Sequence, residues 1–125
     1  MGRRDCRVKQ IVVVDDEPVI RDVLTALFES EGYAVRTAAD GLAALEVVAE
    51  QPPDLVIADI IMPRLDGWGL LASLREQYPE IPIILLSATF RGQPPNGAIL
   101  VAKPFDVDHL LATVGRELNR TAGAE

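Results

Sequence analysis

Residues 11–18 of the chain read IVVVDDEP, and this stretch decides the fold. Its first four residues are apolar and β-branched without any polar alternation, which is typical of a strand buried on both faces of a sheet. Asp15 and Asp16 follow at the carboxyl end of that strand, and Pro18 suits the first turn of a helix. The stretch therefore predicts a buried strand of an α/β sheet with two acids at its carboxyl end.

The same order of buried strand, polar residue and helix recurs along the chain. Further strands are predicted at 33–37, 55–58, 83–86 and 99–102, and amphipathic helices are predicted to start at Pro18 and after Asp40, Gly67 and Asp106. Alternating strands and helices imply βαβ units, hence a parallel sheet covered on both faces. Residues 89–97 contain two prolines and no apolar periodicity, so the helix between the last two strands is expected to be shortened or absent.

Composition limits the class of protein. The chain has 125 residues, 49% of them hydrophobic, so we predict one domain at 9–120 between a flexible arm at 1–8 and a tail at 121–125. The net charge of −7 argues against direct binding of nucleic acid. The apolar runs are too short to span a bilayer and Cys6 is the only cysteine, so a soluble, cytoplasmic protein without a disulfide or a membrane partner is expected.

Five polar residues follow or end predicted strands and should share the carboxyl edge of the sheet, where such folds bind ligands. Three of them are carboxylates, Asp15, Asp16 and Asp59, which need a cation if all are to stay ionised, and an all-oxygen cluster suits Mg²⁺ or Mn²⁺. The other two, Lys103 and Ser87, offer an ammonium and a hydroxyl that could stabilise a transferred phosphoryl group. One carboxylate would then be free to act as the nucleophile.

Four segments of the chain resemble the receiver domain of two-component response regulators, namely residues 13–18, 59–67, 87–88 and 103–105. The resemblance extends from about Lys9 to Leu118. It implies a flavodoxin-like, doubly wound sheet of five parallel strands in the order 2-1-3-4-5.

Carried over position by position, the resemblance implies that Asp59 is the phosphoacceptor. It further implies that Asp16, Asp59 and the backbone carbonyl of Ile61 bind the metal directly, and that Asp15 binds it through a water. Ser87 and Lys103 would contact phosphoryl oxygens. The Lys103-Pro104 peptide bond would be cis, as it is in the family.

The resemblance also assigns modulating positions. Ile61 and Thr89 match positions that influence how fast the acyl phosphate hydrolyses, and Pro104 belongs to the lysine-proline motif. Leu100 stands where the family usually has an aromatic residue that changes rotamer during switching. Together with the short 88–98 segment, Leu100 leaves open a receiver-fold interaction module whose switching is degenerate or independent of phosphorylation.

The implied partners are a histidine kinase or a histidine phosphotransfer protein, a downstream protein, and a second copy of the chain in a homodimer. The protein would catalyse only its own phosphorylation and dephosphorylation. An aspartate-nucleophile phosphatase is disfavoured because its motif separates two acids by one residue, whereas Asp15 and Asp16 are adjacent. A dinucleotide-binding domain is disfavoured because no glycine-rich turn follows the first strand. A stand-alone regulator and a piece of a longer one both remain open.

Overall fold

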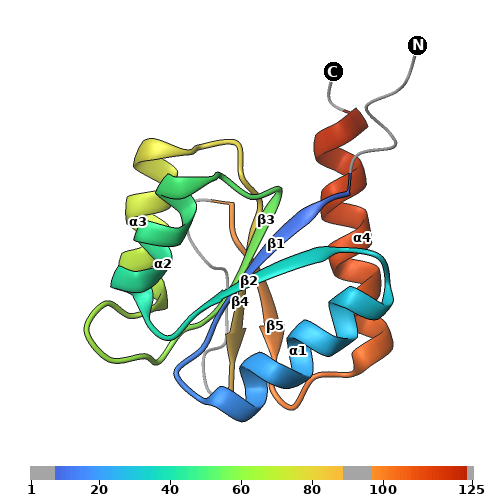
Figure 1. Ribbon diagram of the computed structural model, residues 1–125, viewed down its shortest axis with the longest axis horizontal. Coiled ribbons are helices and arrows are strands. Elements are labelled where there is room, and N and C mark those ends of the chain that lie inside the picture. Colours follow the sequence, from blue (N-terminus) through green and yellow to red (C-terminus); the bar gives the residue numbers. More distant parts are fainter. Residues whose placement is uncertain (1–7, 89–96, 124–125) are drawn as a thin grey trace.

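The computed structural model describes residues 8–88 and 97–123, with side chains described as far as Asn119. Within these residues, five parallel strands form one sheet in the order β2-β1-β3-β4-β5, with helices on both faces (Figure 1). The predicted doubly wound, flavodoxin-like fold and its strand order are confirmed. The elements in chain order are β1 (Gln10–Val14), α1 (Pro18–Ser30), β2 (Ala34–Ala38), α2 (Gly41–Glu50), β3 (Leu55–Asp59), α3 (Gly67–Gln77), β4 (Ile83–Ser87), β5 (Ile99–Ala102) and α4 (Val107–Gly123).

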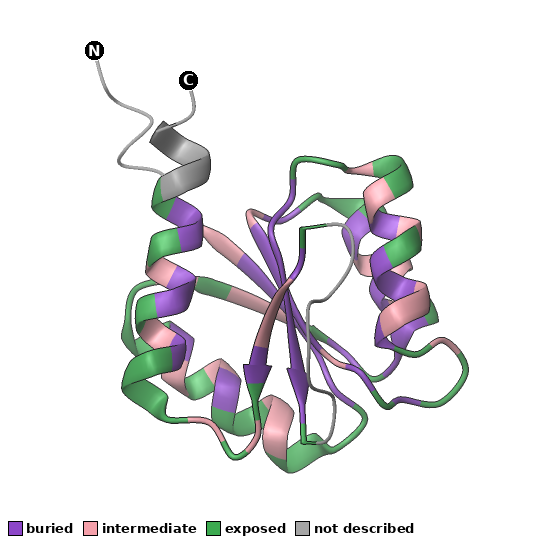
Figure 2. Cartoon of the chain, turned by 180° about the vertical axis from the view of Figure 1, so that it is seen from behind, coloured by how far each residue is buried: buried purple, intermediate pink, exposed green. Residues whose placement is uncertain are grey.

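Each face of the sheet has its own apolar core, because successive strand residues point to opposite faces. The inner strands are buried except at Gln10 of β1 and Asp59 of β3, while the helices bury one side and expose the other (Figure 2). On one face, Val12, Val56 and Leu85 pack with residues of α2 and α3. On the other, Ile11 and Ile57 pack with residues of α1 and α4. Burial on both faces explains why the strand sequences show no polar alternation.

Aspartate side chains cap the starts of α2, α3 and α4. Asp40 Oδ1 accepts a hydrogen bond from the N–H of Ala43 at 2.8 Å, and Asp66 Oδ1 accepts one from the N–H of Gly69 at 2.9 Å. Asp106 Oδ1 accepts one from the N–H of Asp108 at 3.0 Å, just before α4. The predicted caps at Asp40 and Asp106 are thereby confirmed, and both satisfy N–H groups that a helix start leaves without a partner.

Some boundaries differ from the sequence-based prediction. β2 lies one residue later than the predicted 33–37, because its pairing with β1 sets the register and matches Gln10 with Ala34. α4 continues to Gly123, so residues 121–123 of the predicted tail are helical, since extending a formed helix costs little. The predicted shortening of a helix concerns residues 89–96, which lie outside the described residues, as do 1–7 of the predicted arm.

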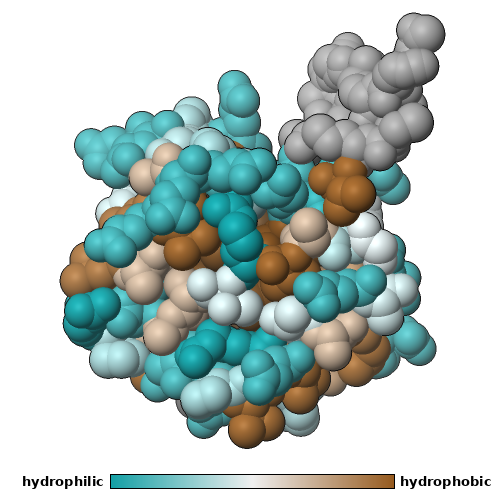
Figure 3. All heavy atoms as spheres, in the orientation of Figure 1, coloured by the Kyte–Doolittle hydropathy of each residue, from teal (hydrophilic) through white to brown (hydrophobic). Residues whose placement is uncertain are grey.

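The surface seen in Figure 3 carries hydrophobic residues in separate patches among hydrophilic ones. The largest fully buried side chains, including Phe28 and Leu24 of α1, lie in the cores instead. Among the described residues, no helix has the length and apolar character needed to cross a membrane.

Candidate functional site

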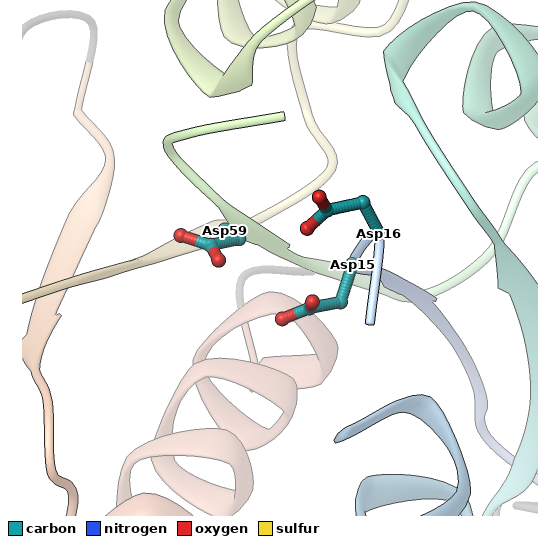
Figure 4. Close-up of side chains that lie close together, drawn as sticks. All are labelled: Asp15, Asp16 and Asp59. Atoms are coloured by element: carbon teal, nitrogen blue, oxygen red, sulfur yellow. The ribbon is translucent and has the colours of Figure 1, made fainter. Parts of the chain in front are cut away.

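Three aspartates meet at the carboxyl edge of the sheet. Asp15 and Asp16 follow β1 and Asp59 ends β3, and because β1 pairs with β3 the three side chains lie close together (Figure 4). One carboxylate oxygen of each residue lies within 4.8 Å of the corresponding oxygens of the other two. The convergence predicted from the strand ends is therefore present, and this cluster could hold a metal ion.

Asp15 is the most buried of the three, at 1% exposed. Its Oδ1 atom accepts a hydrogen bond from the N–H of Glu17 at 2.9 Å, but its buried Oδ2 atom has no hydrogen-bond partner. Burial raises the pKa of Asp15, and the negative charges of Asp59 and Asp16 act in the same direction, against the Glu17 N–H and Lys103. A buried carboxylate oxygen without a partner is costly, and a bound cation would satisfy it.

Lys103 connects the ends of three strands. Its Nζ atom donates a hydrogen bond to Asp59 Oδ2 at 2.9 Å, and its backbone N–H donates to the Ser87 carbonyl at 2.7 Å. Burial alone would lower the pKa of Lys103, but the hydrogen bond and charge of Asp59 raise it above its ordinary value. The ammonium therefore stays charged at neutral pH beside the predicted nucleophile. The Lys103-Pro104 peptide bond is cis, as the resemblance implied.

Asp16, Asp59 and Lys103 line a cleft of about 250 Å³ at the carboxyl edge of the sheet. Acids on one part of its wall and the ammonium of Lys103 on another suit a divalent cation together with a phosphoryl group. A larger hollow of about 440 Å³, formed by residues 52–54 and 77–82, has no basic residue in its lining that could pair with a phosphate. The smaller cleft is the better candidate because it contains the reactive groups. Its lining consists of Asp16, Glu17, Asp59, Ile60, Ile61, Ser87, Ala88 and Lys103.

Ile61 lies in the loop between β3 and α3 and lines the same cleft. Its N–H donates to Asp59 Oδ1 at 3.4 Å, and Ile61 as a whole is 71% exposed. The loop closes at its base, where the N–H of Gly67 donates to the Ile60 carbonyl at 2.7 Å. A Cβ atom on Gly67 would lie 2.6 Å from Ile60 Cα, so only glycine allows this close approach, which keeps Ile61 beside Asp59.

Sequence reasoning gave no role to two arginines near the site. Arg21 Nη1 donates to the Asp15 carbonyl at 2.7 Å, and Arg64 donates two hydrogen bonds to the Asp40 carboxylate, at 2.9 and 3.1 Å. The position of Arg21, in the first turns of a helix that follows the acids, is a local signal that could have identified its contact. Arg64 lies 24 positions from Asp40, and no local pattern indicates their pairing.

Leu100 and Pro104, like Ile61, are predicted modulating residues that the structure describes. Leu100 is half-buried, pairs with Leu85 in the sheet, and packs on the face covered by α2 and α3. Pro104 follows Lys103 through the cis bond. Thr89 lies outside the described residues.

The family model of the response regulator receiver domain matches residues 11–115 of the chain. The chain belongs to this family. It is thus a receiver domain of two-component signal transduction, as the motifs at the strand ends predicted.

Curated relatives resemble this receiver domain over most of its length. It is 32% identical to the probable transcriptional regulatory protein TcrX of Mycobacterium tuberculosis, over 97% of the chain and 54% of that protein. It is 40% identical to the probable transcriptional regulator ycf27 of Cyanophora paradoxa, over 90% of the chain and 49% of that protein. The chain spans about half the length of these curated relatives.

Solved structures of similar sequence have the same fold. The receiver domain of NtrX from Brucella abortus is 36% identical with a TM-score of 0.78, over 87% of this chain and 98% of that one. The chemotaxis response regulator CheY4 of Vibrio cholerae is 30% identical with a TM-score of 0.82, over 89% of this chain and 99% of that one. The match to nearly complete single domains agrees with a receiver domain as the folded unit.

Proposed function

We propose that this receiver domain accepts a phosphoryl group on Asp59 from the phosphohistidine of a histidine kinase or a histidine phosphotransfer protein. Phosphorylation would then change its affinity for a downstream protein. The observation that carries the proposal is the contact between Lys103 and Asp59 in a cleft that Asp16 also lines, with Asp15 beside them in the acid cluster. A cytoplasmic location is part of the proposal, since a single cysteine suits a reducing compartment.

The acid cluster fits a divalent metal by its donor atoms and by the buried, unpartnered Oδ2 atom of Asp15. Asp16, Asp59 and the Ile61 carbonyl would hold Mg²⁺ or Mn²⁺ directly, and Asp15 would hold it through a water. Bound there, the ion would neutralise the carboxylates and the charge on the phosphoryl oxygens.

Asp59 is the proposed nucleophile. One of its carboxylate oxygens attacks the phosphorus, so an O–P bond forms while the N–P bond of the phosphohistidine breaks. The electron pair of that bond returns to the imidazole nitrogen. Lys103 would move its ammonium from the Asp59 carboxylate to a phosphoryl oxygen, and the Ser87 hydroxyl would donate to another. The protein contributes mainly position and charge, which is what phosphoryl transfer requires.

The same residues would support loss of the phosphoryl group. Water attacks the phosphorus, the O–P bond to Asp59 breaks, and the carboxylate and inorganic phosphate are released. The chain would thus catalyse its own phosphorylation and dephosphorylation and no reaction on other substrates. Ile61, a residue 71% exposed beside Asp59, would hinder the approach of that water.

A second candidate is a receiver-fold interaction module that binds its partner without phosphorylation. The observation that favours it is Leu100, an aliphatic residue half-buried against the core at the position where the family usually has a mobile aromatic. The first candidate predicts that phosphorylation of Asp59 changes the affinity for the partner. The interaction module predicts that this affinity stays the same.

Incubation with Mg²⁺ and a small phosphodonor tests the proposal. Intact-mass measurement should show one added phosphoryl group in the wild type, and none when Mg²⁺ is chelated or in Asp59→Asn. Beryllofluoride with Mg²⁺ should also change the fluorescence of Trp68. This residue lies in the first turn of α3, directly after the loop that connects β3 to α3. Absence of any metal-dependent response in the wild type would favour the interaction module.

A further inference from the structure

Arg64 has a backbone conformation that side chains rarely adopt. Its φ is 68°, and among the described residues it is the one non-glycine with a positive φ. The N–H of Leu65 donates to the Pro63 carbonyl at 2.8 Å, a hydrogen bond that closes a three-residue turn around Arg64. Turns of this kind with a positive central φ are rare and strained, and such strain persists only where surrounding contacts hold it.

The contacts that hold Arg64 come from the start of α2. Its Nε and Nη2 atoms donate to the two carboxylate oxygens of Asp40, at 2.9 and 3.1 Å, in the two-pronged geometry that suits arginine and a carboxylate. The Arg64 hydrogen bond, followed by the Ala43 N–H, holds the pKa of Asp40 below its ordinary value. We refer to the contact between Asp40 and Arg64 as the loop clamp.

A second contact joins the same two segments. The N–H of Gly41 donates to the Leu65 carbonyl at 3.1 Å, and a Cβ atom on Gly41 would collide with that carbonyl oxygen. Asp40 and Gly41 therefore hold the part of the β3–α3 loop that contains Arg64 and Leu65. Its base is closed by the hydrogen bond from Gly67 to Ile60. Ile61 lies between these two attachments, beside Asp59.

We propose that Asp40 and Arg64 are positioning residues for metal binding at the Asp59 site. The loop clamp keeps the β3–α3 loop in the shape that holds Ile61, and with it a backbone carbonyl, next to the acid cluster. This inference rests on the proposed function, because it assumes that the cluster binds a divalent cation.

Global stability is not the main role of the clamp. The Arg64 side chain is 59% exposed, and ion pairs with so exposed a partner contribute little to folding. The charge of Arg64 also has the wrong sign to assist a cation, so removing it should strengthen Mg²⁺ binding if charge alone mattered. A weaker affinity after removal of Arg64 would therefore report the lost geometry of the loop.

The test is calorimetric titration of Mg²⁺ into the full chain and into Arg64→Gly, Asp40→Asn and the double variant. Glycine adopts a positive φ without strain, so Arg64→Gly removes the clamp without adding a backbone cost. Asparagine is a good N-cap, so Asp40→Asn keeps the cap of α2 and loses the charged contact. Thermal unfolding of each variant checks that the fold is retained.

The matched control is Arg36→Ala. Arg36 donates hydrogen bonds to the carbonyls of Val47 and Gln51 and thus holds the opposite end of α2, away from the cleft. This variant loses an arginine that contacts the same helix. We expect it to lower the unfolding temperature and to leave the dissociation constant for Mg²⁺ unchanged.

We expect each clamp variant to bind Mg²⁺ about tenfold more weakly, as is typical when a group that orients metal ligands is lost. The double variant should be no weaker than the single ones, because both changes break one contact. Wild-type affinity in Arg64→Gly, or fully additive losses in the double variant, would overturn the inference and leave the proposed function intact. A wild type that binds no Mg²⁺ would overturn both.

Discussion

The Nζ atom of Lys103 lies 2.9 Å from Oδ2 of Asp59, so the residue that follows β5 and the last residue of β3 form an ion pair in the cleft. Both side chains are largely shielded, at 25% and 15% exposed. In the unphosphorylated protein the lysine neutralises part of the acid cluster. If Asp59 is phosphorylated as proposed, the same ammonium would lie close to the phosphoryl oxygens.

Replacing Lys103 with alanine should separate metal binding from phosphoryl transfer. Without the ammonium the carboxylates lose a competing cation, so Mg²⁺ affinity should stay the same or increase. The rate of phosphorylation by a small donor should fall by about a hundredfold, the usual cost of losing one group that stabilises transferred charge. Mg²⁺ titration and intact-mass time courses measure the two effects. An unchanged phosphorylation rate would contradict the role of Lys103.

Asp15→Asn should stabilise the metal-free protein at neutral pH. Burial raises the pKa of Asp15, so the folded state binds a proton on this carboxyl group more tightly than the unfolded state does. In the unfolded state the pKa of Asp15 is near 3.8. Ionisation of Asp15 therefore lowers stability as pH rises above that value. At pH 7 the variant should gain about 1 kcal/mol, the typical cost of an unsatisfied buried acceptor.

Thermal unfolding in a chelator at a series of pH values measures this gain. The difference between Asp15→Asn and the wild type should disappear toward pH values at which Asp15 is protonated in both states. Added Mg²⁺ should stabilise the wild type more than the variant. A difference that does not depend on pH would rule out ionisation of Asp15 as its cause.

Two glycine substitutions should have opposite effects. A Cβ atom on Gly67 would lie 2.6 Å from Ile60 Cα and 2.7 Å from the Asp59 carbonyl, so Gly67→Ala should destabilise the fold by about 1–3 kcal/mol. A Cβ atom on Gly115 in α4 meets nothing within 4 Å, and Gly115→Ala should stabilise by about 0.5–1 kcal/mol. Chemical denaturation compares the pair. Equal changes in the free energy of unfolding would mean that the β3–α3 loop can shift to accommodate the added Cβ atom on Gly67.

Ile61→Ala should shorten the lifetime of the phosphorylated protein. The smaller side chain would leave Asp59 more open to water, and a loss of about 0.7 kcal/mol of barrier corresponds to roughly threefold faster hydrolysis. Decay of the phosphorylated mass after removal of the donor gives the rate. Equal decay rates for Ile61→Ala and the wild type would show that this side chain does not limit the access of water.

Much of the fold could be predicted because its signals are local. The buried strand at 11–14 and the acids after it identify a strand end, and Asp40 identifies a helix start, each from adjacent residues. The site followed from topology, since Asp15, Asp59 and Lys103 end or follow strands that a parallel sheet brings to one edge. These three residues were found without knowledge of any side-chain contact.

The sequence was less informative where a contact joins distant segments. The pairing of Arg64 with Asp40 depends on the path of the β3–α3 loop past the start of α2, and no periodicity encodes that path. The register of β2 likewise depends on its partner strand, which moved the element by one residue from the predicted 33–37. The end of α4 shifted because helix ends depend on small energies that no apolar pattern marks.

Reductive trapping identifies the phosphorylated residue directly. Borohydride reduces an aspartyl phosphate to homoserine, and peptide mass spectrometry then locates the changed position. After incubation with Mg²⁺ and a small phosphodonor, we predict homoserine at position 59 and none at Asp15 or Asp16, with no trapping when Mg²⁺ is chelated. Homoserine at either of those two positions, or its absence from Asp59 in a protein that has gained phosphoryl mass, would contradict the assignment.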